Sequence, residues 1–448
     1  MSLAIVILAA GKGSRMKSRL PKVLHEVGGT SLIHHCLNTA RDLAADKTVV
    51  VTGHEGDLVR AAVSDLSKNV GFAQQKEQLG TAHAVSQAEG FLKNHPGYTV
   101  VLYGDSPFIT ADTIREMHAE CKAGAAICVL GFEAENPARY GRLVVGPEGL
   151  ETIVEYKDAT PEQQAITLCN SGVMCAKSEL MFQLISRVDN QNAKGEYYLT
   201  DLPRLARAEG GKCAVVTCNE AETLGVDTRS GLSKAEAYFQ KTARGRAMEH
   251  GATLRDPNTV HFSFDTQLGQ DVVIDPFVQF LPGVQVADDV HIKSHCTFEA
   301  CQIASGAVIG PYARLRPGAN LAEDVRIGNF VEVKKSILHR GAKVNHLTYI
   351  GDAEIGAAAN IGAGTITCNY DGVFKHKTTI GAGAFIGSNS SLVAPITIAD
   401  DALVGSGSVI TQDVGPGDLA VSRAKQVTKA GWGKRFMDKL RVKKAKKE

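Results

Sequence analysis

A bulky apolar residue recurs at every sixth position through the second half of this 448-residue chain. The recurrence runs in three lines: Leu268, Ile274, Phe280, Val286, Ile292 and Phe298; Ile303, Ile309, Leu315, Leu321, Ile327 and Val333; and Ile380, Ile386, Leu392, Ile398, Val404 and Ile410. A period of six fits neither an amphipathic helix nor an alternating strand, and it is typical of a parallel β-helix. We therefore expect a solenoid with these side chains in its core and its functional residues on the outside.

Two steps in these lines are one residue short of the period. Phe298 is followed by Ile303, and Val333 is followed by Leu338. A shortened step changes the length of one corner of a solenoid without interrupting its core. We expect a tightened corner or an adjusted loop at both places.

The apolar positions lapse between Ile361 and Ile380. Within this gap, residues 365–372 read Thr-Ile-Thr-Cys-Asn-Tyr-Asp-Gly. A solenoid that interrupts its period usually extrudes a loop there, and such loops often carry function. We expect the β-helix to span residues 251–423. The basic tail after Gly433 is expected to be a frayed, solvated end, with a polyanion-binding tail as the alternative.

The first 229 residues show a different pattern, in which short apolar runs alternate with helix-forming stretches. The apolar runs are 5–8, 48–51, 100–103, 127–130 and 215–217, and the helical stretches are 31–43 and 112–121. This alternation predicts an α/β, Rossmann-like domain with a mostly parallel sheet. Residues 230–250 are charged, rich in helix formers and followed by Gly251, which predicts a linker helix. The predicted domains are thus 1–229, the linker 230–250, and a β-helix domain with a basic tail, 251–448.

Charge and cysteine usage exclude several classes of protein. The chain carries 49 basic and 48 acidic residues, and this balance gives no sign of binding to nucleic acid or to a membrane. Its ten cysteines include no Cys-x-x-Cys pair, so neither a zinc site nor a disulfide framework is favoured. The first apolar run is too short for a signal peptide, and no run reaches membrane-spanning length. These features predict a cytoplasmic protein in a reducing setting.

A glycine-rich segment follows the first apolar run. Residues 8–16 read Leu-Ala-Ala-Gly-Lys-Gly-Ser-Arg-Met, and Pro21 and Lys22 come shortly after. Glycines after a strand let the backbone approach a phosphate closely, and Arg15 and Lys22 would add positive charge. The segment lacks the third glycine of a dinucleotide fingerprint and the Gly-Lys-Ser/Thr ending of a P-loop. Taken alone, it is equally compatible with an ordinary tight turn.

The whole run with its downstream Pro-Lys resembles the signature of the sugar-phosphate nucleotidyltransferases. The resemblance implies a site for UTP and the UDP-sugar formed by Leu8, Ala9, Ala10, Gly11, Arg15, Lys22, Gln75, Gly80, Thr81, Tyr103, Gly104, Asp105, Gly141, Glu155, Asn170 and Asp227. Arg142, in the sequence Tyr140-Gly141-Arg142, is implied to lie against the sugar as well. The implied reaction is attack of a sugar-1-phosphate oxygen on the α-phosphorus of the nucleotide, with pyrophosphate leaving. Such a reaction needs positioning and charge neutralisation and no protein nucleophile.

Asp105 and Asp227 are the implied Mg²⁺ ligands. Asp105 follows an apolar strand, where open α/β sheets hold ligands, although an aspartate there is more often a cap or turn residue. The family's second ligand is usually the Asn of a Gly-Val-Asn sequence, and here Gly225-Val226-Asp227 replaces it. An aspartate keeps an oxygen ligand and adds a negative charge, so we expect metal binding to survive.

Polar motifs stand between the apolar positions of the predicted β-helix. They are Arg314-Leu315-Arg316-Pro317-Gly318, the segment 328–335, His346-Leu347-Thr348-Tyr349, the segment 360–364, and Asn369-Tyr370-Asp371-Gly372 with Lys375 in the predicted loop. Each motif alone has an ordinary explanation as a surface histidine, a solvated lysine pair or a passive turn. Together with the N-terminal half, their order resembles the bifunctional N-acetylglucosamine-1-phosphate uridyltransferase / glucosamine-1-phosphate acetyltransferase family over nearly the whole chain.

By this resemblance, His346 is the general base that takes a proton from the 2-amino group of glucosamine-1-phosphate as it attacks acetyl-CoA. Glu332 could orient His346. The sugar phosphate would be held by Arg316, Lys334, Tyr349, Asn360 and Lys375. The acetyl-CoA site would include Ala363, Asn369, Tyr370, Ser388, Ser406 and Arg423, with Asn369 and Tyr370 also positioning the sugar.

The resemblance further implies a left-handed β-helix, a homotrimer with acetyltransferase sites shared between neighbours, and a product, UDP-N-acetylglucosamine, used for bacterial cell-envelope polysaccharides. Two alternatives remain. A single-headed nucleotidyltransferase with a scaffolding or regulatory β-helix predicts no acetyl-CoA turnover, and a non-enzymatic assembly subunit predicts neither activity. His346 with Asn369 and Tyr370 argues against the first alternative, and the glycine-rich run with Asp105 argues against the second.

Overall fold

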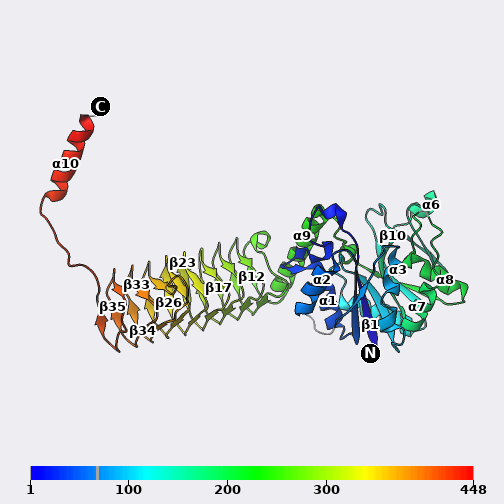
Figure 1. Cartoon of the computed structure of the whole chain (residues 1–448), viewed down its shortest axis with the longest axis horizontal. Helices are drawn as coiled ribbons and strands as arrows, with labels where there is room; N and C mark the ends of the chain where they lie inside the picture. The colour runs from blue at the N-terminus through cyan, green and yellow to red at the C-terminus, as the bar shows by residue number, and fades with distance from the viewer. Residues whose placement is uncertain (1, 67–69, 193, 447–448) are drawn as a thin grey trace. The chain divides into compact units, whose positions relative to one another are not determined.

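The computed structural model describes residues 2–66, 70–192 and 194–446 (Figure 1). The chain divides into two compact units, Met1–Ala243 and Arg244–Glu448. The boundary falls within helix α9 (Arg229–Glu249), which begins and ends one residue before the predicted 230–250.

The first unit is built on a nine-stranded sheet with the order β11-β7-β10-β6-β1-β4-β5, and the hairpin β8–β9 adjoins β10. Its strands are β1 (Leu3–Ala9), β4 (Lys47–Thr52), β5 (Val70–Gln74), β6 (Tyr98–Tyr103), β7 (Ile127–Glu133), β8 (Arg142–Gly146), β9 (Gly149–Val154), β10 (Leu168–Lys177) and β11 (Cys213–Cys218), and β2 (Glu26–Val27) pairs with β3 (Thr30–Ser31). Strand β10 is antiparallel to β6 and β7, whereas the other pairs on the main path are parallel. The predicted mostly parallel sheet is confirmed.

Helices cover both faces of this sheet. They are α1 (Leu32–Asp42), α2 (Gly56–Leu66), α3 (Thr81–Ser86), α4 (Glu89–Leu92), α5 (Ala111–Lys122), α6 (Pro161–Gln164), α7 (Ser178–Ile185) and α8 (Leu202–Ala208), with 3₁₀ turns η1 (Ser14–Met16), η2 (Lys22–Leu24), η3 (Leu199–Asp201) and η4 (Glu220–Thr223). Because strand side chains alternate between faces, β1 sends Ala4 and Val6 into one core and Ile5 and Ile7 into the other. The first core packs against α3, α7 and α8, and the second against α1, α2 and α5.

The second unit is a coil with three parallel sheets, which we call faces 1, 2 and 3. Face 1 contains β12 (Thr253–Leu254), β14 (Val273–Ile274), β17 (His291–Ile292), β20 (Val308–Ile309), β23 (Arg326–Asn329), β26 (Lys343–His346), β29 (Asn360–Ile361), β32 (Phe385–Ile386), β35 (Leu403–Val404) and β37 (Leu419–Ala420). Face 2 contains β15 (Gln279–Phe280), β18 (Thr297–Phe298), β21 (Arg314–Leu315), β24 (Glu332–Lys334), β27 (Tyr349–Gly351), β30 (Ile366–Cys368), β33 (Ser391–Val393) and β36 (Val409–Ile410). Face 3 contains β13 (Gln267–Leu268), β16 (Gln285–Val286), β19 (Gln302–Ile303), β22 (Ala319–Leu321), β25 (Ser336–Leu338), β28 (Ala353–Ile355), β31 (Thr378–Ile380) and β34 (Ile396–Ile398), and a 3₁₀ turn η5 (Pro257–Thr259) follows β12.

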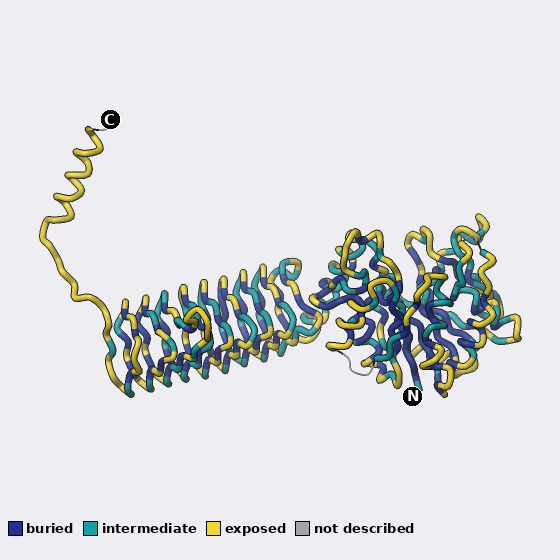
Figure 2. Tube along the Cα trace, viewed as in Figure 1, coloured by how far each residue is buried: buried dark blue, intermediate teal, exposed yellow. Residues whose placement is uncertain are grey.

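The sixth-position side chains fill the interior of this coil, as predicted. Ile274, Ile292 and Ile309 pair in register on successive coils and are fully buried. Phe280 and Phe298 are also buried, with their ring centroids 5.4 Å apart. Figure 2 shows the resulting alternation of buried and exposed positions along each coil. Each buried side chain of this size contributes roughly 1.5–3 kcal/mol, so the period itself stabilises the fold.

The two shortened steps fall at the corner between faces 2 and 3. Ile303 still pairs with Val286, so the strand register is unaffected. The shortened corners place Ala300 and Lys335 in the left-handed region, with φ of 40° and 45°. The expected tightened corners are confirmed.

The expected lapse of the core after Ile361 is wrong for the first coil. Thr367 takes the next inward position, in β30, with 1% of its surface exposed. Its hydroxyl oxygen accepts the N–H of Gly351 at 2.8 Å, which satisfies a polar group in the core. Only the segment after Cys368 leaves the coil, and it returns at Thr378.

The basic tail forms helix α10 (Trp432–Ala445) rather than a frayed end. All described residues from 421 onward are exposed, which agrees with the predicted solvation. Elsewhere in the chain, all ten cysteines are free thiols, and eight of them are buried. Within the described residues, no helix is long and apolar enough to span a membrane.

Candidate active sites

Loops from the carboxyl ends of neighbouring strands meet at one edge of the first unit's sheet. The glycine-rich loop follows β1, and Gly104 follows the adjacent strand β6. The Gly104 N–H donates to the Leu8 carbonyl at 2.9 Å, and Gln78 Nε2 donates to the Ala10 carbonyl at 2.8 Å. The predicted nucleotide-binding segments are thus brought together at the edge where parallel sheets hold ligands.

The predicted base-reading residues also lie together. Gln75 is buried, and its Nε2 donates to the Gly80 carbonyl at 3.1 Å. Gly80 has a φ of +118°, and a Cβ there would lie 2.4 Å from the Tyr197 carbonyl oxygen, so only glycine fits. Thr81 Oγ1 accepts the Leu199 N–H at 2.9 Å. Backbone contacts therefore fix both sides of this segment.

Two carboxylates far apart in the sequence share one ammonium group. Lys22 Nζ donates to Asp227 Oδ1 at 2.7 Å and to Asp105 Oδ2. Arg15 contacts the other oxygen of Asp227 at 2.9 Å. Burial alone would lower the pKa of Lys22, but Asp105 and Asp227 outweigh it and raise that pKa. Burial would raise the pKa of Asp227, but Lys22 and Arg15 outweigh it and lower that pKa.

The same two carboxylates fit a hard divalent cation. Asp105 Oδ2 and Asp227 Oδ1 already flank a single cationic nitrogen, and carboxylate oxygens are the ligands that Mg²⁺ prefers. Within the described residues, no cluster of three or more histidine, cysteine or acidic side chains could hold a metal ion. A cation at Asp105 and Asp227 would therefore take its remaining ligands from water and phosphate, as Mg²⁺ commonly does.

The predicted sugar-binding residues lie around Tyr103. Asn170 Oδ1 accepts the Gly172 N–H at 2.9 Å, and a Cβ on Gly172 would lie 2.7 Å from the Tyr103 ring. Burial raises the pKa of Tyr103, and the charges of Asp105 and Glu155 raise it further. Burial also raises the pKa of the half-buried Glu155 carboxyl. The structure thus brings Asn170 and Glu155 to the residues that end β6.

Arg142 is buried and bonded to backbone carbonyls, which leaves its guanidinium out of reach of a bound sugar, contrary to the expectation. It is 2% exposed, and its guanidinium donates to the carbonyls of Pro137, Ala138 and Gln164 at 3.2–3.3 Å and to that of Tyr140. A buried cation is stable only when such acceptors surround it. Arg142 therefore fixes the loop that presents Gly141.

Replacing Arg142 with methionine should lower the free energy of unfolding of the first unit by about 3 kcal/mol, because several buried carbonyls lose their donor. Arg139, exposed on the same loop, is the matched control, and Arg139→Met should change stability by less than about 0.5 kcal/mol. Urea unfolding measures both variants. Equal stabilities would contradict the structural role of Arg142.

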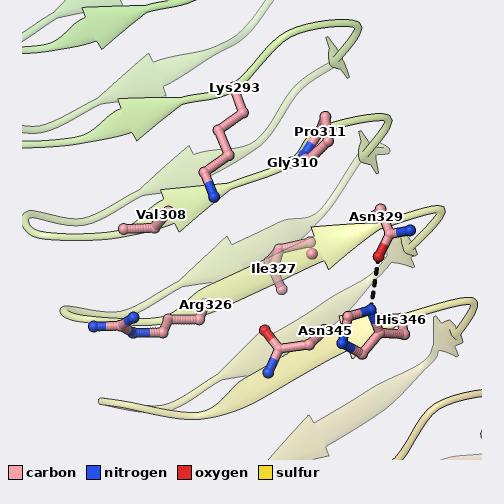
Figure 3. A pocket seen from close by; sticks show the side chains of 10 residues that line it. Lys293, Val308, Gly310, Pro311, Arg326, Ile327, Asn329, Asn345 and His346 are labelled. Carbon is pink, nitrogen blue, oxygen red and sulfur yellow. Dashed lines mark hydrogen bonds between the residues drawn. The ribbon is translucent and has the colours of Figure 1, made fainter.

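His346 ends strand β26 and lines a cavity on the outside of the β-helix. The cavity has a volume of about 240 Å³ and lies over β20, β23 and β26 (Figure 3). Its lining residues are Lys293, Val308, Gly310, Pro311, Arg326, Ile327, Gly328, Asn329, Asn345 and His346. Two cations and two amides beside an exposed imidazole make this a polar pocket suited to an anionic or hydrogen-bonding ligand.

Within one chain, the side chain that contacts the His346 ring is Asn329 and not Glu332. Asn329 Oδ1 lies 2.7 Å from His346 Nδ1, and the two residues pair on adjacent strands (Figure 3). Glu332 instead accepts from Arg316 at 2.7 Å and lies 3.7 Å from Arg314. Within one chain, Glu332 thus contacts these arginines and not His346, and its expected role in orienting His346 stays a prediction. The 17-residue separation of Asn329 and His346, one coil, was the available signal.

The predicted acetyl-CoA residues form a line that continues from His346. By the register of face 1, His346, Ala363, Ser388 and Ser406 occupy the same corner position on successive coils. Parallel strands are about 4.8 Å apart, so the line is roughly 14 Å long. Arg423 NH1 donates to the Ser406 carbonyl at 2.6 Å and closes its far end. The arrangement offers an extended surface for a long, flexible ligand.

The predicted sugar-phosphate residues gather at the other end of the face 2 strands. Arg316 and Lys334 occupy equivalent positions on adjacent coils. A Cβ on Gly351 would lie 2.3 Å from the Tyr349 hydroxyl and 2.8 Å from Asn369 Nδ2, so those polar groups converge where only glycine fits. His346 precedes these strands, whereas the cations follow them.

The extruded loop carries Lys375 to the same end. Lys375 Nζ lies 3.8 Å from the centre of the Tyr370 ring. The His376 ring contacts the Asp371 carboxylate, which also accepts the backbone N–H groups of Phe374 and Val373, and these contacts hold the pKa of Asp371 well below its usual range. Asn360, by contrast, lies on face 1, one coil after Lys343. The structure therefore sets Asn360 apart and groups the other predicted residues into two sets at opposite ends of the face 2 strands.

Known protein families match both the α/β unit and the β-helix. Residues 5–170 match the family model of the MobA-like NTP transferase domain. Residues 265–300 and 377–412 match the family model described as bacterial transferase hexapeptide (six repeats). The repeats support the predicted left-handed form of the β-helix. A crystal structure of UDP-glucose pyrophosphorylase complexed with UDP-glucose aligns with a TM-score of 0.44 and 17% identity, covering 54% of this chain and 100% of that chain.

Full-length relatives are far more similar. The Bifunctional protein GlmU of Paramagnetospirillum magneticum is 54% identical over 448 residues, which cover 100% of this chain and 99% of the relative. That of Paracoccus denitrificans is 55% identical over 442 residues, covering 99% and 98% of the two chains. Similarity of this degree along the whole length leaves no part of the chain outside the match. The chain belongs to the family of the bifunctional protein GlmU.

Proposed function

We infer that this chain makes UDP-N-acetylglucosamine in two steps at two active sites. The β-helix transfers an acetyl group from acetyl-CoA to glucosamine-1-phosphate, and the α/β domain then joins the product to UMP from UTP and releases pyrophosphate. The observation that carries the proposal is the presence, in one chain, of the Asp105–Asp227 pair and an imidazole oriented by Asn329. Both co-substrates are metabolites of the cytoplasm, where we place the reaction.

In the uridylyl transfer, the sugar phosphate oxygen attacks the α-phosphorus while the bond to pyrophosphate breaks. The backbone of residues 10–13 and Arg15 would hold the phosphates, and Gln75 with Gly80 would face the base. Asp105 and Asp227 would hold Mg²⁺, which neutralises phosphate charge in reactions of this kind. The protein's own contribution is then to align the two substrates and to supply charge, which suffices when no covalent intermediate forms.

In the acetyl transfer, the amine nitrogen of the sugar attacks the thioester carbon, the C–S bond breaks, and CoA leaves as the thiolate. The carbonyl oxygen of Asn329 can only accept, so the proton of the neutral His346 ring sits on Nδ1. Nε2 is therefore the free base that takes the proton from the attacking amine. Arg316, Lys334 and Lys375 would hold the sugar phosphate, because converging cations match its two negative charges.

Replacing Asn329 tests this assignment. In Asn329→Ala the ring loses its orienting acceptor, and kcat for acetyl transfer should fall about 10- to 100-fold while the uridylyl transfer rate stays unchanged. In Asn329→Asp a carboxylate favours the protonated imidazole, so the acid limb of the pH–rate profile should move to higher pH by about one unit. An unchanged profile in Asn329→Asp would exclude direct contact between the two residues during turnover.

We further propose a homotrimer in which neighbouring chains complete each acetyltransferase site. Within one chain, His346 and the sugar-phosphate cations lie at opposite ends of face 2, so a second copy can supply the missing half. An exposed ladder runs along the corner beside His346 and comprises Phe277, His295, Tyr312, Phe330 and Leu347. Successive rings in it are 4.9, 4.7 and 5.1 Å apart. Large exposed apolar surfaces of this kind usually mark association sites.

The purified full-length protein tests the two-step proposal in one vessel. Mg²⁺, glucosamine-1-phosphate and acetyl-CoA are supplied and free CoA thiol is followed, after which UTP is added and pyrophosphate is followed. Thiol release followed by pyrophosphate supports both steps. Pyrophosphate formed only from added N-acetylglucosamine-1-phosphate, without thiol release, would favour the single-headed nucleotidyltransferase.

A further inference from the structure

Lys22 occupies the space between the two proposed metal ligands. Its ammonium donates to Asp105 Oδ2 and, at 2.7 Å, to Asp227 Oδ1. Only 13% of the Lys22 side chain is exposed, so this is an enclosed ion pair and not a surface contact. Mg²⁺ binds oxygen at about 2.0–2.1 Å. An ion shared by these two oxygens therefore has to take the place of the ammonium.

The charges of this cluster are balanced before any metal arrives. Asp227 uses Oδ1 for Lys22 and Oδ2 for Arg15, whose nitrogen lies 2.9 Å away. Two carboxylates thus face two cations. A divalent ion added beside Lys22 would bring three positive centres against two carboxylates at contact distance, which is unfavourable in a partly buried site. Both space and charge require Lys22 to leave when a metal binds.

The Lys22 side chain can move while its backbone stays in place. Lys22 begins the 3₁₀ turn η2, and its Cβ lies against the glycine-rich loop, because a Cβ on Gly13 would approach it to 2.7 Å. Beyond Cβ the side chain is a flexible stem that ends in a compact charge. The ammonium can therefore swing about a fixed point beside the loop to which we assign the phosphates.

We propose that Lys22 and the divalent metal compete for Asp105 and Asp227, and that metal binding releases the Lys22 ammonium to the nucleotide phosphates at the adjacent loop. The proposal rests on the metal site of the proposed function. In this proposal Lys22 is a positioning residue whose ammonium has two positions. In the first it neutralises Asp105 and Asp227 while no metal is bound, and in the second it contacts the nucleotide phosphates. Metal binding and nucleotide binding then strengthen one another, because each favours the released position of Lys22.

Metal affinity without any nucleotide is the direct test. The full-length protein is stripped of metal and titrated with Mn²⁺ alone, and free Mn²⁺ is followed by electron paramagnetic resonance. Lys22→Met removes the ammonium and keeps most of the stem, and it should bind Mn²⁺ about 10-fold more tightly than the unaltered protein. Lys17→Met removes the same charge from an exposed position further along the same loop and should change the affinity by less than about 2-fold.

Equal or weaker Mn²⁺ binding by Lys22→Met would overturn the competition. Asp105→Asn, titrated in parallel, separates this failure from a failure of the metal site. Binding lost in Asp105→Asn but not tightened in Lys22→Met keeps the metal site and rejects the competition. Binding that survives Asp105→Asn rejects the metal site itself. If Lys22→Met unfolds at a lower temperature than the unaltered protein, Lys22→Gln takes its place in the same comparison.

Discussion

His346→Ala should lower kcat for acetyl transfer from acetyl-CoA to glucosamine-1-phosphate by about 10³-fold. The imidazole is held by Asn329 at 2.7 Å, and among the residues that the structure describes no other side chain hydrogen-bonds to this ring. Without it, the amine must lose its proton to water as it attacks the thioester. Pyrophosphate formation from supplied N-acetylglucosamine-1-phosphate should be unchanged, because that reaction uses groups in the other compact unit. Thiol release and pyrophosphate release, measured on one preparation, check both statements.

His339 provides the matched control for this variant. It lies on the same coil, directly after β25, and its ring contacts Glu354 at 3.0 Å and not Asn329. His339→Ala should keep acetyl transfer within about 2-fold of the unaltered protein, as expected for a surface substitution. An equal loss of activity in both variants would mean that the β-helix is merely disturbed and that His346 has no chemical role.

Asp105→Asn should have the opposite selectivity. The amide keeps the size of the side chain but removes the charge that faces Lys22 and the proposed metal, so uridylyl transfer should fall by at least about 10²-fold. Acetyl transfer should be unaffected. Initial rates of pyrophosphate release at saturating UTP and Mg²⁺ measure the loss, and thiol release measures the unaffected activity.

The control for Asp105→Asn is Asp112→Asn. Asp112 is an exposed residue in the first turn of α5, where it pairs with Arg115. It lies on the segment that follows Asp105 but faces solvent, and its substitution should leave both activities within about 2-fold. Full uridylyl transfer by Asp105→Asn would remove this carboxylate from the mechanism.

The sequence predicts those features of the fold that depend on period and on strand ends. The six-residue period requires a coil with Ile274, Ile292 and Ile309 stacked in its interior, and the structure has this arrangement. The apolar period does not predict the inward position of Thr367, because a threonine fills such a position by hydrogen-bonding to the backbone. The same reasoning from strand ends places Asp105 beside the glycine-rich loop.

Contacts between distant side chains could not be predicted in the same way. The sequence indicates that Lys22, Asp105 and Asp227 belong to one site, but it does not show that one ammonium bridges both carboxylates across 83 and 205 residues. Asn329 was overlooked and Glu332 preferred, because choosing between them requires the register of β23 and β26. Arg142 was expected at the sugar because it stands in a motif that matches the family, and only the structure shows its burial among backbone carbonyls.

The central claim is that one chain carries two independent active sites connected by a released intermediate. Purified His346→Ala and Asp105→Asn proteins, each supplied with glucosamine-1-phosphate, acetyl-CoA, UTP and Mg²⁺, should each fail to make UDP-N-acetylglucosamine. Mixed in one vessel, they should make it after a short lag, because Asp105→Asn releases N-acetylglucosamine-1-phosphate that His346→Ala consumes. No product from the mixture, although each variant retains its own half-reaction, would contradict the account.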